Sequence, residues 1–327
     1  MKKLLLKTGQ YGIFILVALE ILTRVFHLYT EDPPRFIDDK LVEKRIPGHQ
    51  GYAVTGNRNQ NFSKFNINQA GFNSHREFLP TKKKKEIALI GDSFIEGFHQ
   101  DYDDSTGKKV ERLLDSTEVY EYGYAGYDLA NQMHLIQAYS ADFENIDEII
   151  IYLNYESDLQ RGAYEPNHER IALLSSTLFK IRDNIKLLAY GSKIGILEPI
   201  KRLLTGNDTH TTSLIKEEHD NDAISLNIPL SDQKTYLENF KSLVSLYGFN
   251  SCKTSILLDS RKTPQSFLAY LNEKKFKYID YANEFKASEK PVTLIYDHHW
   301  NNNGRALIAK VIVEFIKTKK QQSNNCK

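Results

Sequence analysis

The fold is decided by the stretch Ile87-Ala88-Leu89-Ile90-Gly91-Asp92-Ser93. Four apolar residues in a row, ended by a glycine, are typical of a short buried strand. The turn Gly91-Asp92 then places a serine directly after the strand. Further apolar runs alternate with helical patterns: strands are expected at 118–122, 148–153, 254–258 and 277–279, and helices at 106–114, 129–141, 231–246, 263–273 and 303–317. Strands separated by helices predict an α/β fold with a parallel sheet, with ligand-binding residues at the carboxyl ends of the strands.

The composition limits the choice of partner and compartment. The chain has 327 residues, enough for one catalytic domain of about 200–250 residues with attached segments. Its formal net charge is +1, which gives no electrostatic reason to expect nucleic acid as a partner. The two cysteines, Cys252 and Cys326, are not a disulfide framework and do not identify a compartment.

The N-terminal segment predicts a membrane anchor over residues 1–29. Residues 11–29 are mostly apolar, and as a helix they would span about 28 Å, close to the hydrocarbon thickness of a bilayer. Their only formal charges, Glu20 and Arg24, stand four residues apart and can pair on one helix face. Lysines at 2, 3 and 7 favour a cytoplasmic N-terminus, and no small-residue cleavage site follows. We expect an uncleaved, single-pass signal anchor in the cell inner membrane, with the remainder in the periplasm; the alternative is an amphipathic helix on a soluble core.

Two further segments flank or interrupt the predicted domain. Residues 30–85 are rich in proline, asparagine and glycine, which predicts a stalk and a small cap with short strands. Residues 86–320 are expected to hold the catalytic domain. Within it, residues 165–228 interrupt the alternation, with a helical pattern at 171–188 and a polar loop at 206–227. We expect this insertion to shape the substrate cleft or a partner surface.

Three side chains supply the parts of an acyl-transfer site. A serine hydroxyl is a poor nucleophile at neutral pH; it needs a base within hydrogen-bond reach, and the base needs a carboxylate that fixes its tautomer. Ser93 is the candidate nucleophile, and Asp297-His298-His299 offers an acid and a base on one loop. We favour His299 as the base because Asp297 can reach it two positions away, whereas His298 is adjacent to the acid. Adjacent histidines do not chelate one ion easily, so we expect no metal.

An oxyanion hole would need N–H donors at neighbouring strand ends, each commonly worth about 2.7–4 kcal/mol. Gly126 follows the second strand and offers a backbone N–H with no side chain in the way. Asn154 and Ser157 follow the third strand and could give a side-chain donor. We therefore expect the donors among Ser93, Gly126, Ser157 and Asn154.

The order of these motifs resembles the SGNH (GDSL-type) hydrolase superfamily. The matching elements are Gly91-Asp92-Ser93, Gly126, Ser157-Asp158 and Asp297-x-His299-Trp300-Asn301, and the resemblance covers roughly residues 66–160 and 230–317. It implies a flavodoxin-like three-layer α/β/α sandwich and an esterase or O-acyltransferase, often acting on cell-envelope polysaccharides. It also implies Ser93 as nucleophile, His299 as base and Asp297 as the acid that orients it. The N–H groups of Ser93 and Gly126 would be oxyanion donors.

The chain departs from the family pattern in two places. The last motif usually spaces its acid and base as Asp-x-x-His; here the spacing is Asp-x-His, a variant similar to alginate-acetylation relatives. The asparagine of the third motif is replaced by Ser157. Its hydroxyl can rotate, so the direction in which it donates is less fixed than that of an amide, and Asn154 is the candidate substitute.

Two functions follow from the resemblance. The first is an extracytoplasmic serine esterase or O-acetyltransferase that forms an acyl-enzyme on an ester of a cell-envelope or extracellular glycan. A transferase could take its acyl group from a membrane-embedded donor protein. The second is a catalytically weak or dead member of the fold, a membrane-tethered glycan-binding or scaffold component. We favour the enzyme because all three members of the triad remain, and we expect no cofactor.

Overall fold

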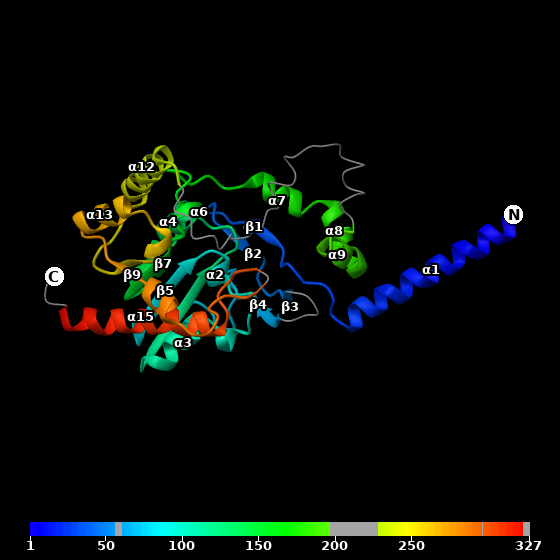
Figure 1. The fold of residues 1–327 in the computed structure, drawn as a ribbon, viewed down its shortest axis with the longest axis horizontal. Helices are drawn as coiled ribbons and strands as arrows, with labels where there is room; N and C mark the ends of the chain where they lie inside the picture. The colour runs from blue at the N-terminus through cyan, green and yellow to red at the C-terminus, as the bar shows by residue number, and fades with distance from the viewer. Residues whose placement is uncertain (56–60, 197–227, 296, 323–327) are drawn as a thin grey trace.

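A computed structural model of the chain describes residues 1–55, 61–196, 228–295 and 297–322. Its centre is a parallel sheet of five strands in the order β6-β5-β7-β8-β9 (Figure 1). The strands are β5 (Lys85–Gly91), β6 (Thr117–Gly123), β7 (Glu148–Tyr152), β8 (Thr254–Leu258) and β9 (Tyr278–Asp280). Counted along the chain, this order is 2-1-3-4-5, that of a flavodoxin-like doubly wound sheet. The predicted parallel α/β fold is confirmed.

Helices cover both faces of the sheet, giving three layers. One face packs against α4 (Leu129–Ala138), α12 (Leu230–Tyr247) and α13 (Gln265–Glu273); the other packs against α2 (Ser93–Glu96), α3 (Thr106–Leu113), α14 (Ala282–Ala287) and α15 (Asn302–Gln322). Along β5, Ala88 and Ile90 lie in the first core, and Ile87 and Leu89 lie in the second. Successive strand residues point to opposite faces, so a strand buried on both sides is a continuous apolar run.

Short helices connect these elements, and some predicted boundaries change. The helix predicted over 171–188 is three helices, and two more flank β7; the five are α5 (Ser140–Asn145), α6 (Tyr155–Asp158), α7 (His168–Leu174), α8 (Thr177–Asn184) and α9 (Lys186–Lys193). The break between α7 and α8 falls at two serines, residues that favour helix ends over interiors. The helix predicted over 231–246 is α12, which begins one residue earlier at Leu230 with Pro229 as its N-cap. The polar loop predicted at 206–227 lies outside the described residues.

The segment before the sheet forms two antiparallel strand pairs, β1 (Arg35–Ile37) with β2 (Glu43–Arg45) and β3 (Gln50–Thr55) with β4 (Asn61–Asn66). It is not a free stalk. Arg45 is 1% exposed, and its guanidinium binds the carboxylate of Glu96 in α2. The hydroxyl of Tyr127 donates to a backbone carbonyl of β2. These contacts pack the segment beside the carboxyl ends of β5 and β6.

The N-terminal helix α1 (Lys2–Val25) is long and apolar enough to cross a membrane; its apolar window has a mean hydropathy of 1.5 and none of that window is buried. It lies within the anchor expected over residues 1–29 and ends at Val25. The expected pair forms, with 2.7 Å between Nε of Arg24 and Oε1 of Glu20. Glu20 also accepts the first backbone N–H groups of α9 at 3.0 and 2.7 Å. These partners offset the cost of a carboxylate in an apolar helix.

Candidate active site

Ser93 is the first residue of α2, directly after the turn that ends β5. A Cβ at Gly91 would lie 2.4 Å from Cγ1 of Ile95, so only glycine fits this turn. Asp92 caps α2 by accepting the backbone N–H of Phe94 at 2.9 Å. The turn therefore holds the half-buried Ser93 at the carboxyl edge of the sheet, where ligands of parallel sheets bind.

The imidazole of His299 reaches this serine. Its Nε2 lies 2.8 Å from Oγ of Ser93. On the other side of the ring, Nδ1 lies 3.4 Å from Oδ1 of Asp297, which also accepts the backbone N–H of His299 at 3.1 Å. His298, between the two, has a φ of +60°, a left-handed conformation that turns the loop back on itself. The structure thus brings together the serine, histidine and aspartate singled out from the sequence.

Aromatic packing and one buried arginine hold the histidine loop against α2. The ring of Phe94 lies 4.6 Å from that of His299 and 5.0 Å from that of Trp300, between centroids. Arg305 of α15 is fully buried; its Nη1 donates to the carbonyl of Phe94 at 3.0 Å, and its Nε donates to the carbonyl of Trp300 at 3.2 Å. One guanidinium therefore ties the serine helix to the histidine loop.

A second histidine, His99, joins the cluster and was not predicted from the sequence. Its ring stacks on that of His299, with centroids 3.9 Å apart and planes at 21°. Its Nε2 lies 3.0 Å from Oδ2 of Asp297, so the carboxylate faces one imidazole at each oxygen. Gly97, with a φ of +71°, ends α2 and turns the chain so that His99 meets the loop. His99 follows no strand end, so no spacing pattern pointed to it.

His99, Asp297 and His299 also form a group of residue types that can bind a metal, found among the described residues. Their ligand atoms lie within 4.8 Å of one another, close enough for one ion. Zinc takes ligands that converge in a tetrahedron. Two nearly parallel stacked rings direct their nitrogens side by side rather than towards one point. A carboxylate shared by two imidazoles therefore accounts for the cluster better than an ion.

Burial and charge set the protonation states in this cluster. Burial raises the pKa of Asp297, but the contacts and charges of His299 and His99 together lower it by more, so its pKa lies well below the usual range. Burial lowers the pKa of His299 from 6.5, and the charge of His99 lowers it further, while Asp297 opposes both. His299 is therefore neutral at neutral pH and able to accept a proton.

Replacing His99 by phenylalanine is expected to move the acid limb of kcat/KM for ester hydrolysis to higher pH. This limb reports the pKa of the base in the free enzyme, and activity rises as His299 loses its proton. Phenylalanine keeps a stacking surface but removes the charge that lowers the pKa of His299. It also removes the contact of His99 with Asp297, so the carboxylate interacts with His299 alone. Both changes raise the pKa. The variant also loses one charge-assisted contact, which is worth about 1.5–3 kcal/mol. The pH-independent value of kcat/KM above the limb should therefore fall by roughly 10–150-fold at most.

The pH profile of His75→Phe is the matched control. His75 stacks on Tyr102, with ring centroids 5.1 Å apart, and is not among the described contacts of Ser93, His299 or Asp297. This profile should match that of the wild type. A limb that stays in place or moves to lower pH in His99→Phe would contradict the influence assigned to His99.

Gly126 follows β6 on a loop that packs against the serine helix. The backbone N–H of Ala125 donates to Oε2 of Glu96 at 3.1 Å. Gly126 is exposed, with a φ of +94°, and a Cβ there would lie 2.3 Å from Nη1 of Arg170. Its missing side chain makes room for an arginine that was not singled out from the sequence. The part of Gly126 as an oxyanion donor to a substrate on Ser93 stays a prediction.

Ser157 and Asn154 lie around α6. The hydroxyl of Ser157 donates to Oδ1 of Asp158 at 2.8 Å, and Oδ1 of Asn154 caps α6 by accepting a backbone N–H at 3.3 Å. Burial raises the pKa of Asp158 well above its usual range, and the charge of Asp92 raises it further, which places α6 beside the nucleophile turn. Among the described hydrogen bonds, none joins Ser157 or Asn154 to Ser93, so their oxyanion roles also stay predictions.

Asn154→Ser is expected to lower the rate of acyl-enzyme formation by about 10²–10³-fold, the usual effect of losing one oxyanion donor. Serine keeps an oxygen that can cap α6 but lacks the amide N–H. Ser157→Ala should cost less than about tenfold on the same scale, because its hydroxyl already donates to Asp158. Stopped-flow measurement of the acylation burst separates the two variants. The opposite ranking would assign the side-chain donor to Ser157.

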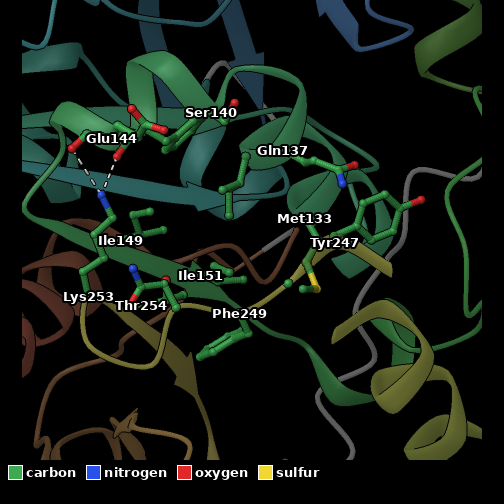
Figure 2. A pocket seen from close by; sticks show the side chains of 14 residues that line it. Met133, Gln137, Ser140, Glu144, Ile149, Ile151, Tyr247, Phe249, Lys253 and Thr254 are labelled. Atoms are coloured by element: carbon green, nitrogen blue, oxygen red, sulfur yellow. Dashed lines mark hydrogen bonds between the residues drawn. The ribbon is translucent and has the colours of Figure 1, made fainter. Parts of the chain in front are cut away.

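A cavity of about 440 Å³ lies at the other edge of the sheet (Figure 2). It is lined near the first residues of β7 and β8, by Ile149 and Thr254, whereas Ser93 follows the last residue of β5. Because the strands are parallel, the cavity and Ser93 lie at opposite ends of the sheet. Lys253 on the cavity wall donates to the carbonyls of Phe143, Glu144 and Ile146 at 2.7, 3.4 and 3.0 Å. This lysine satisfies the end of α5, a structural role.

No family model and no curated protein matches the chain. Solved structures are similar to it. A member of the lipolytic protein G-D-S-L family from Veillonella parvula shares 16% identity at a TM-score of 0.38 over 71% of this chain and 98% of that chain. The lipase/acylhydrolase from Enterococcus faecalis shares 14% at 0.39 over 72% and 96%. A carbohydrate acetylesterase family member from Sinorhizobium meliloti shares 12% at 0.32 over 72% and 98%.

These identities and TM-scores are low, so the chemistry of the site rests on the chain's own contacts. The sheet has the flavodoxin-like order, and the first three motifs follow β5, β6 and β7. The last motif closes on the first through the contact of His299 with Ser93. In sheet order and in the placement of its motifs, the chain resembles the SGNH (GDSL-type) hydrolase superfamily.

Proposed function

We propose that the chain is a serine esterase or O-acetyltransferase that acts on an ester of a cell-envelope or extracellular glycan. The observation that carries this proposal is the distance of 2.8 Å between Oγ of Ser93 and Nε2 of His299, with Asp297 behind the ring. A serine bonded to a neutral imidazole that a carboxylate orients is an activated nucleophile.

In the proposed mechanism, Ser93 attacks the ester carbonyl while His299 takes the serine proton. The tetrahedral intermediate carries a negative oxygen, for which the N–H groups of Ser93 and Gly126 and the amide of Asn154 are the proposed donors. Collapse expels the alcohol, which receives the proton from His299, and leaves an acyl group on Ser93. Water in an esterase, or a sugar hydroxyl in a transferase, then accepts the acyl group. A transferase would draw the acyl group from a membrane-embedded acyl donor protein.

A membrane-tethered glycan-binding protein on the same fold is the second candidate. It is favoured by Ser157, which stands where the family pattern has an amide and whose hydroxyl is engaged with Asp158. The contact between Ser93 and His299 supports the enzyme instead, because a binding protein has no use for an activated serine.

The test is the acylation of envelope polysaccharide, measured by mass spectrometry in cells that carry the wild-type chain or Ser93→Ala. An esterase predicts more acyl groups in the Ser93→Ala cells, and an O-acetyltransferase predicts fewer. Ser266→Ala, at an exposed serine of α13, is the control and should match the wild type. Equal acylation in all three strains would contradict the enzyme and favour the binding protein.

We also propose that α1 anchors the chain in the inner membrane and that the domain faces the periplasm. The apolar surface of α1 and the lysines near its start support this orientation. On alkaline extraction, the full chain should stay in the membrane pellet, whereas a chain without residues 1–29 should be released. Release of the full chain would contradict the anchor.

A further inference from the structure

Three arginines from distant segments gather at the loop of Ala125 and Gly126: Arg35 in β1, Arg45 in β2 and Arg170 in α7. Arg45 is neutralised by carboxylates. Its Nε and Nη2 donate to Glu96 at 2.8 and 3.2 Å, and its Nη1 lies 2.5 Å from Oδ1 of Asp32. Arg45 is therefore a structural residue, and the other two arginines need a separate explanation.

Arg170 makes no ion pair with a described residue. Its Nη2 donates to the backbone carbonyl of Ala125 at 3.3 Å, and its Nη1 occupies the space that a side chain on Gly126 would fill. The side chain is only partly buried. A guanidinium carries five N–H donors in a planar fork, so most of the donors of Arg170 remain for a ligand.

Arg35, at the same loop, has few hydrogen-bond partners among the described residues. Its Nη1 donates to the carbonyl that Arg170 also uses, at 2.9 Å, and its Nε is buried without a hydrogen-bond partner among the described residues. The nearest carboxylate oxygen, on Asp32, lies 3.7 Å from Nη2 of Arg35 and is already held by Arg45. Burial lowers the pKa of Arg170, and the charge of Arg35 lowers it further, as expected for two cations that face each other.

Glu43 is the other carboxylate in the neighbourhood. It counters part of the positive charge on Arg170, but its Oε1 accepts the backbone N–H of Asn167 at 3.0 Å. Neither Glu43 nor Asp32 forms the bidentate pair with Arg170 that Glu96 forms with Arg45. An added anion would therefore complete the cluster rather than compete with an existing pair.

The cluster lies one loop away from the nucleophile. The N–H of Ala125 donates to Glu96, and Glu96 is the last residue of the helix that Ser93 begins. A Cβ on Gly123, at the end of β6, would lie 2.0 Å from the backbone nitrogen of Glu96, which shows how closely this loop packs on α2. A sugar whose ester reaches Ser93 can therefore bring a neighbouring substituent to Arg170.

We propose that Arg170, with Arg35, binds an anionic substituent, a carboxylate or a phosphate, on the glycan whose ester reacts at Ser93. This inference rests on the proposed esterase or O-acetyltransferase function and gives its substrate a class, the acidic glycans. A carboxylate or a phosphate offers two oxygens that can bind the guanidinium fork together, whereas a neutral sugar gives the fork no charged partner. The proposal also gives the insertion a role, because α7 carries Arg170 to the loop of Ala125 and Gly126.

Three acetylated sugars test the proposal with the full chain in detergent micelles. They are a methyl glucoside, the corresponding methyl glucuronide and the glucoside 6-phosphate, which differ in one substituent. The wild type should show a kcat/KM for acetate release that is about 10–150-fold higher with one of the anionic sugars than with the neutral one. Whether the carboxylate or the phosphate gives the larger ratio identifies the anion. Arg170→Gln should bring the ratio close to one, and Arg170→Lys, which keeps charge without the fork, should give an intermediate ratio.

Arg112→Gln, at an exposed arginine of α3, is the control and should keep the wild-type ratio. A wild-type ratio near one for both anionic sugars would overturn the subsite while leaving the esterase intact. If no sugar releases acetate, an esterase is excluded, and binding of oligogalacturonate against a neutral oligosaccharide tests the subsite alone. Preference for the acidic chain that Arg170→Gln abolishes would support the subsite, and equal binding would overturn it.

Discussion

Ser93→Ala and His299→Ala are each expected to lower kcat/KM for nitrophenyl acetate by about 10⁴-fold or more. The serine supplies the attacking oxygen, and the imidazole, 2.8 Å away, removes its proton, so either loss stops the same step. Residues that act as a unit are not additive. The double variant should therefore be no slower than either single variant, and all three should have the same residual rate.

His298→Asn is the matched control for this experiment. Its backbone has a φ of +60°, which asparagine tolerates better than most residues, and its side chain is not the one that contacts Ser93. Its kcat/KM should stay within about tenfold of the wild type, less than the effect of losing one oxyanion donor. A His298→Asn variant as slow as His299→Ala would mean that the base was assigned to the wrong histidine.

Glu96→Ala is expected to lower the free energy of unfolding by about 3–5 kcal/mol, because it leaves Arg45 charged and without its bidentate partner. Arg45 and Glu96 are both nearly inaccessible to solvent, with side chains 1% and 2% exposed. Burial lowers the pKa of Arg45, but the carboxylates of Asp32 and Glu96 raise it above its ordinary range, so the guanidinium stays charged. Urea unfolding of the full chain in micelles measures the loss.

Two further variants separate this buried pair from an ordinary ion pair. Glu238→Ala breaks an exposed pair with Lys241 and should leave the midpoint of urea unfolding close to that of the wild type. Arg45→Met combined with Glu96→Leu removes both buried charges and should recover much of the stability lost in Glu96→Ala. A double variant as unstable as the single one would show that shape, rather than uncompensated charge, sets the cost.

The parallel sheet was predictable because its central strands β5, β7 and β8 are buried on both faces. Residues 87–90 and 149–151 are continuous apolar runs, and their alternate side chains fill two separate cores. The triad was predictable for a related reason. Ser93 follows a strand directly, and Asp297 and His299 lie close together in the sequence, so local spacing already limited their geometry.

The remainder of the site depends on contacts that no local pattern encodes. His99 reaches Asp297 only because Gly97 turns the chain and the histidine loop closes over it. Arg170 reaches the loop of Gly126 from an insertion, and Arg45 reaches Glu96 from a segment expected to be a stalk and a small cap. Each pairing joins segments far apart in the sequence, and single charged residues in polar segments look alike before the chain folds.

The central claim is that His299 activates Ser93. Peptide mass spectrometry after treatment with a fluorophosphonate tests it most directly, because this reagent forms a stable adduct with activated serines. The adduct should be found on Ser93 in the wild-type chain and should be lost in His299→Ala, where the serine remains but its base is gone. An unmodified Ser93 in the wild type, or equal modification in both chains, would contradict the claim.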